Sequence, residues 1–166
     1  MNKIKLIIAL LFFVPTIVFC QNTSHFSIAK TSTGEIKIPG NWEELNTVED
    51  SGQTYYKNKD GVIIAVAKNP KKAYPFFLKN KSDFENVKLF YVWDSDYMKE
   101  SKYKTDFIKE DSKSEYVIWK YNAGKLDNVY LFGSIKDTFL NLLVYTNDWT
   151  ENEKITFLES VYKLNK

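Results

Sequence analysis

The residues best suited to binding a ligand lie close together near the middle of the chain. Trp93 is followed directly by Asp94, and Asp96 comes two positions later. An aromatic ring beside two carboxylates is one way for a protein to hold a sugar, because the ring offers a large apolar platform and the acids offer hydrogen-bond acceptors. We therefore take Trp93, Asp94 and Asp96 as the candidate ligand-binding residues.

The same segment also has some of the features of a calcium loop, because Asp94 and Asp96 alternate as the first ligands of such a loop do. An EF-type loop requires a glycine at its sixth position and a bidentate glutamate at its twelfth. Lys99 and Thr105 occupy those positions here. We therefore predict no metal site, and the simpler interpretation of residues 94–96 is the solvated face of a helix.

Other catalytic sets are excluded by composition and spacing. His25 is the only histidine and Cys20 the only cysteine, so neither a His/Cys zinc site nor an ordered Ser-His-Asp triad is expected. Tyr116 and Lys120 have the spacing of the short-chain dehydrogenase pair, but they lie in a predicted strand and no Gly-x-Gly-x-x-Gly motif accompanies them. We predict no catalytic residue and no cofactor.

The first 20 residues have the form of a secretory signal peptide. Lys3 and Lys5 form a positive start, an apolar run extends to Phe19, and polar sequence begins at Gln21. We expect cleavage between Cys20 and Gln21 and export to the periplasm or the extracellular space, with no stable membrane span after processing. Two alternatives stay open: a lipid anchor on Cys20, disfavoured by the bulky residue before it, and a retained membrane anchor.

The charge balance argues against nucleic-acid binding. All 23 basic residues are lysines, and they face 21 acidic residues. Loss of residues 1–20 would remove two lysines and no acid, which leaves the remaining chain formally neutral. A protein that binds nucleic acid needs a basic excess, and arginine is the usual bidentate reader of phosphate and guanine.

The elements that position these residues can be placed from local patterns. After a polar lead-in at 21–25, alternating apolar residues over 26–38 predict a strand pair or one bent strand. Asp60-Gly61 separates two β-rich runs at 53–57 and 62–67, which indicates a hairpin. Residues 114–122, 127–134 and 138–146 predict a three-strand meander. In residues 62–67 and 139–145 the side chains of both alternating sets are mainly apolar. We therefore expect those strands to be covered on both faces.

Two capping boxes predict two helices. The first begins at Ser82, with Glu85 three residues later, and the second begins at Thr150, with Glu153 three residues later. The order of elements predicts a single α+β domain over 26–166, in which an antiparallel sheet packs between helical layers. The many aromatic residues are expected to fill the core, although an exposed Tyr/Trp patch is an alternative for some of them.

A family resemblance follows from these elements and from one short motif. Ile36-Lys37-Ile38-Pro39-Gly40-Asn41-Trp42 resembles the opening strand and Pro-x-x-Trp corner of Mog1/PsbP-like domains, and the composition resembles exported proteins of Bacteroidetes. The resemblance implies an α/β/α sandwich that serves as a non-catalytic binding or assembly factor for a protein partner or small ligand. The alternative is a glycan-binding or carbohydrate-active protein that uses Trp and Tyr with Asp94 and Asp96.

Overall fold

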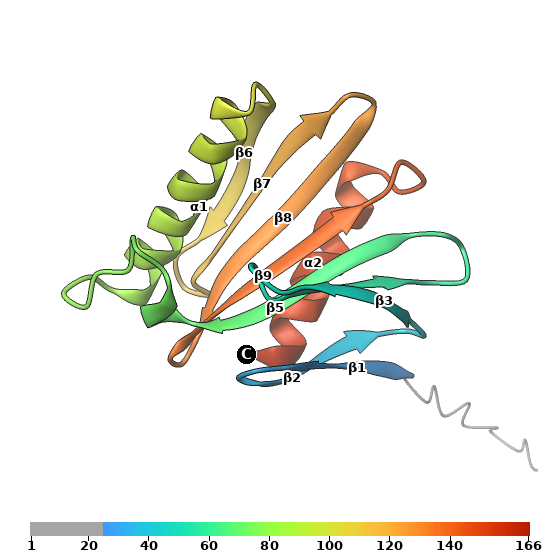
Figure 1. The fold of residues 1–166 in the computed structure, drawn as a ribbon, viewed down its shortest axis with the longest axis horizontal. Helices are drawn as coiled ribbons and strands as arrows, with labels where there is room; N and C mark the ends of the chain where they lie inside the picture. The colour runs from blue at the N-terminus through green and yellow to red at the C-terminus, as the bar shows by residue number, and fades with distance from the viewer. Residues whose placement is uncertain (1–24) are drawn as a thin grey trace, which may run out of the picture.

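The computed structural model describes residues 25–166, and its main element is a seven-stranded sheet. The strands lie in the order β3-β4-β5-β9-β8-β7-β6, and every neighbouring pair is antiparallel (Figure 1). Their bounds are β3 Glu43–Val48, β4 Gln53–Lys57, β5 Ile63–Pro70, β6 Lys104–Asp111, β7 Tyr116–Ala123, β8 Leu126–Ile135 and β9 Thr138–Tyr145.

Two helices and a separate hairpin complete the fold. Helix α1 (Asp83–Glu100) connects β5 to β6 and packs on β6, β7 and β8, while α2 (Glu151–Asn165) follows β9 and packs on β8, β9 and β2. The hairpin consists of β1 (Phe26–Thr31) and β2 (Gly34–Pro39), and it lies beside α2 (Figure 1). A single 3₁₀ turn, η1 (Lys71–Ala73), follows β5.

The two helices cover opposite faces of the sheet because side chains alternate along each strand. One set of alternating residues, including Ile64, Ile118 and Leu142, packs against α2 and the β1–β2 hairpin. The other set, including Trp119 and Phe132, packs against α1. We call the side of the sheet that α2 covers the α2 face and the side that α1 covers the α1 face. Since both sets are apolar in the central strands, the sheet has two hydrophobic cores.

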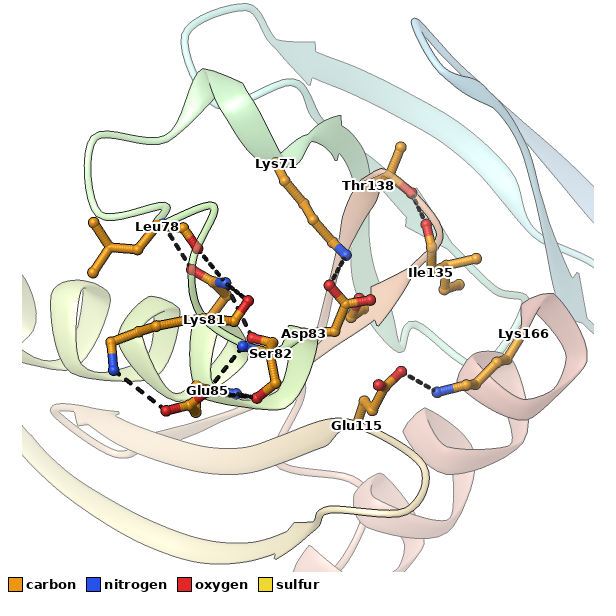
Figure 2. A network of polar contacts seen from close by, with 12 residues as sticks. Lys71, Leu78, Lys81, Ser82, Asp83, Glu85, Glu115, Ile135, Thr138 and Lys166 are labelled. Atoms are coloured by element: carbon orange, nitrogen blue, oxygen red, sulfur yellow. Dashed lines mark hydrogen bonds and ion pairs between the residues drawn. The ribbon is translucent and has the colours of Figure 1, made fainter.

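Both helices begin with the predicted capping boxes. In α1 the Ser82 hydroxyl accepts a hydrogen bond from the Glu85 amide, and the Glu85 carboxylate accepts one from the Ser82 amide (Figure 2). The hydrogen bonds that the Glu85 carboxylate accepts from the Ser82 amide, the Ser82 hydroxyl and the Lys81 ammonium lower the pKa of Glu85 to about 2. Thr150 and Glu153 make the same reciprocal pair in α2.

Replacing Ser82 with alanine is expected to lower the free energy of unfolding by about 1 kcal/mol, because the first turn of α1 then loses its side-chain acceptor. Urea denaturation of the variant measures this loss. The matched control is Ser112→Ala in the exposed β6–β7 turn, which is expected to change stability by less than about 0.5 kcal/mol. Equal stability of the two variants would show that the cap contributes nothing.

The α+β class, the hairpin at Asp60-Gly61, the meander and both helix starts are confirmed. The apolar pattern over 26–38 forms a strand pair. Strands β3 and β6, at the two edges of the sheet, were not predicted, because β3 is exposed along its whole length and β6 is only half-buried, so neither has an apolar alternation. The predicted cleavage site at Cys20 and Gln21 lies outside the described residues. Within 25–166, no helix has the length and apolar character needed to cross a bilayer.

Candidate functional site

A pocket of about 450 Å³ opens on the α1 face, beside helix α1 and toward strands β4, β5 and β9. Helix α1 forms one wall, strands β4, β5, β8 and β9 form the floor, and the β3–β4 turn and the segment after β5 close the sides. The lining residues are Asp50, Ser51, Gln53, Asn69, Ala73, Tyr74, Phe90, Trp93, Asp94, Tyr97, Met98, Tyr130 and Asn141.

The floor of the pocket carries two amide side chains beside apolar residues of the α1 face. Asn141 pairs with Ala67 across β9 and β5 and shares its face with Leu143. Gln53 shares its face of β4 with Tyr55, which packs against the core of the α1 face. The Asn141 Oδ1 and Gln53 Nε2 atoms are buried and have no hydrogen-bond partner among the described residues. Both residues line the pocket, but these two atoms are screened from solvent, so they are an energetic cost to the free protein.

Asp94 is the only acidic residue of the pocket lining that comes from a helix, and it is partly buried. Burial raises the pKa of its carboxyl to about 6. No described residue donates a hydrogen bond to it or forms an ion pair with it, so no described protein group offsets the partial loss of water. Its charge adds to the effect of burial in raising the pKa of Tyr74 and of Tyr130, which places both phenols near the carboxylate.

The rim of the pocket is aromatic. Trp93 is 45% exposed and Tyr97 is 59% exposed, which is unusual for side chains of this size. The Trp93 ring packs against two other rings. Its centroid lies 5.4 Å from that of Phe76 and 6.3 Å from that of Tyr74. Because it packs on these rings, Trp93 presents a firm apolar surface to a ligand.

The structure brings Trp93 and Asp94 together but leaves Asp96 outside the pocket. Positions two apart on a helix differ by about 200° in direction, so Asp94 and Asp96 point to nearly opposite sides of α1. Asp96 is exposed, and its carboxylate lies 2.8 Å from the Lys99 ammonium. The interpretation of this segment as a solvated helix face therefore holds for Asp96 and is wrong for Asp94.

The segment after β5 is anchored so that Tyr74 forms a side of the pocket. The ammonium of the buried Lys71 pairs with Asp83 at the start of α1 (Figure 2). The fully buried Asn86 side chain both accepts from the amide of Leu78 and donates to its carbonyl, at 2.9 Å in each case. With both ends held, the Tyr74 hydroxyl lies 3.0 Å from Asn69 Nδ2, which donates to it.

Sequence reasoning missed most of the pocket floor and its sides, including Gln53, Asn69, Tyr74, Tyr130 and Asn141. One local pattern could have indicated Asn141, since it is the single polar residue in the run Phe139 to Val144, which is otherwise apolar at both parities. An amide at a doubly covered position requires partners, and that requirement points to a site.

Other features of the surface have structural explanations. The Trp42 indole donates a 2.7 Å hydrogen bond to the Pro39 carbonyl and packs on Phe157, so the Pro-x-x-Trp motif forms a corner between β2 and β3. Tyr56 is buried on the α2 face, while Tyr55 lies half-buried on the α1 face. Within the described range 25–166, no three His, Cys, Asp or Glu side chains are grouped as metal ligands.

Comparison with known proteins identifies no relative from which the role of this pocket could be taken: no protein-family model and no curated protein sequence matches the chain.

Proposed function

We propose that this protein is an exported, non-catalytic binding module whose small ligand occupies the pocket on the α1 face. One observation carries the proposal: a single pocket is lined by the Asp94 carboxyl, which has no described partner, by the exposed Trp93 ring, and by Asn141 and Gln53, each of which has an unpaired buried amide atom. Such groups destabilise a free protein unless something binds to them, so their convergence is typical of a ligand site.

The fold supports the same proposal. Two helices on opposite faces of an antiparallel sheet, together with the Pro-x-x-Trp corner, are the arrangement expected of an α/β/α sandwich similar to Mog1/PsbP-like domains. In such a domain a rigid sheet can support a pocket at the side of one helix. Export through the predicted signal peptide would place this pocket in the periplasm or outside the cell.

A second candidate function, glycan binding or glycan hydrolysis, is favoured by the exposed rings and by the raised pKa of Asp94. A carboxyl with a pKa of about 6 can act as a general acid near neutral pH, and Asp50 supplies a second carboxylate to the same pocket. This candidate would use Trp93 and Tyr97 with Asp94. Asp96 has no part in it, because it lies outside the pocket.

Tryptophan fluorescence tests the proposed site. We expect wild-type protein to change its emission with at least one member of a panel of small alkylamines, monosaccharides, cellobiose and short carboxylates, because Trp93 lines the pocket. The Trp93→Phe variant is expected to lose this change, whereas Trp149→Phe, on the opposite side of the sheet next to α2, is expected to keep it. A panel without any response would contradict the proposal.

A hydrolysis assay distinguishes the non-catalytic binding module from the carbohydrate-active alternative. We expect no release of nitrophenol from aryl glycosides by the wild-type protein. Hydrolysis that Asp94→Asn abolishes and Asp96→Asn retains would establish the carbohydrate-active alternative and overturn the non-catalytic proposal.

A further inference from the structure

We infer that the ligand of the α1-face pocket carries a primary ammonium group, which sits against the Asp94 carboxylate and contacts the surrounding aromatic faces. The inference rests on the proposed function, since it names the chemical class that this same pocket selects. It follows from the charge and the aromatic rings of the lining.

The charges of the pocket favour a cation. Asp50 and Asp94 both line it, and no lysine does, although the chain has 23 lysines. Lysines near the two ends of α1 are occupied elsewhere: Lys71 pairs with Asp83, and Lys99 pairs with Asp96. An anionic ligand would add a third negative charge to a partly desolvated site. A neutral ligand would leave Asp94 without the counterion that a desolvated charge requires.

The aromatic side chains favour an organic cation. Tyr74, Trp93, Tyr97 and Tyr130 line the same pocket as Asp94. The faces of aromatic rings attract an ammonium within about 6 Å, and the attraction grows when the site is shielded from water. A carboxylate among several rings therefore provides both the counterion and the polarisable surroundings that an alkylammonium group needs.

The Asp94 carboxylate favours a primary ammonium over a quaternary one. A primary ammonium keeps N–H groups, which can donate charge-assisted hydrogen bonds to the carboxylate oxygens, whereas a quaternary ammonium has none. The pocket volume of about 450 Å³ lies within the range of small-molecule sites.

Calorimetric titration with three ligands of similar shape tests this inference. Cyclohexylmethylammonium is expected to bind, neutral cyclohexylmethanol to bind at least tenfold more weakly, and cyclohexanecarboxylate to show no binding. Asp94→Asn is expected to weaken binding of cyclohexylmethylammonium by at least tenfold. Asp96→Asn is the matched control and is expected to leave this affinity unchanged. Tetramethylammonium is expected to bind more weakly than the primary amine, because it has no N–H group to donate to the Asp94 carboxylate.

The pH dependence of binding provides a second readout. Ammonium affinity is expected to rise about tenfold between pH 5 and pH 8, because Asp94 ionises across this range. Burial raises the pKa of Tyr74, Tyr121 and Tyr130, so these phenols near Asp94 stay protonated there, and the pocket lining adds Tyr97 and the carboxyl of Asp50. The rise in ammonium affinity between pH 5 and pH 8 must therefore persist in the Asp50→Asn variant and disappear in the Asp94→Asn variant.

The possible failures of the two proposals are distinguishable. Ammonium binding that does not depend on Asp94, or a sugar or carboxylate that binds in its place and is lost in Asp94→Asn, would overturn the ammonium inference and leave the pocket as a ligand site. Absence of binding by the amines, alcohol, carboxylate, glucose and cellobiose alike would overturn both. Thermal unfolding of each variant confirms that a loss of binding does not come from a loss of fold.

Discussion

Replacing Asp94 with asparagine is expected to stabilise the ligand-free protein by about 2–3 kcal/mol at pH 8 and to change it little at pH 4. Burial raises the pKa of this carboxyl from 3.8 in the unfolded chain to about 6 in the folded protein. Each unit of such a shift corresponds to about 1.4 kcal/mol of difference between the two protonation states. The asparagine has nearly the same shape and carries no charge, so it removes this cost.

The sign of the effect follows from proton binding. Between pH 3.8 and about 6 the folded protein binds more protons at Asp94 than the unfolded chain does, so stability falls as the pH rises through this window and is level above it. Below pH 3.8 both states hold the carboxyl protonated, and the cost is absent. The stabilisation by Asp94→Asn should therefore develop across this window and reach its full size above about pH 6.

Urea denaturation of both proteins at several pH values between 4 and 8 measures the difference. Asp96→Asn is the matched control: this exposed carboxylate pairs only with Lys99, so its loss is expected to change stability by less than about 1 kcal/mol at every pH. An Asp94→Asn variant that is no more stable than wild type at pH 8 would contradict the description of Asp94 as an uncompensated, desolvated charge.

The second large effect is expected at Gly133, where alanine should destabilise the fold by about 3 kcal/mol or more. Gly133 lies in β8 on the α2 face, and a Cβ added there would overlap the ring of Tyr162. The ring cannot simply turn away. Its hydroxyl donates to the carbonyl oxygens of Ser114 at 2.7 Å and Ser134 at 2.9 Å, and the side chain is buried.

Thermal or urea unfolding of Gly133→Ala measures this cost, and Gly124→Ala is the control. Gly124 has a φ of +66° in the β7–β8 turn and nothing within 4 Å of an added Cβ, so its replacement costs only conformational strain, about 1 kcal/mol. We expect Gly133→Ala to be clearly the less stable of the two. The opposite order would show that α2 shifts on the sheet without a large penalty.

These two positions differ in what they do for the protein. Gly133 allows α2 to lie close to the sheet, so its replacement should weaken the fold. Asp94 weakens the free protein at neutral pH, and no described residue compensates it. A residue that opposes stability inside a pocket is typical of a site shaped by binding, because the cost of desolvating its charge is recovered when a ligand of opposite charge is present.

Local patterns were enough to predict the elements, because each depends on residues close together in the chain. The capping boxes at Ser82 and Thr150 require only three-residue spacing, and the hairpin at Gly61 requires only a positive φ, which is +86° in the structure. The alternation of the central strands determined which residues share a face. The edge strands β3 and β6 escaped prediction because backbone pairing with β4 and β7, and not a local apolar pattern, makes them part of the sheet.

The order of residues along the chain specifies the α+β class, the antiparallel hairpin and meander, both helix starts and the nearness of Trp93 to two acids. Which acid faces inward depends on packing, because the rotation of α1 against β6, β7 and β8 turns Asp94 toward the pocket and Asp96 toward solvent. The folded chain also brings Gln53 and Asn141, 88 positions apart in the numbering, into one pocket with Asp94. Contacts between segments that are far apart in the chain bring these side chains together, and no local sequence pattern predicts such contacts.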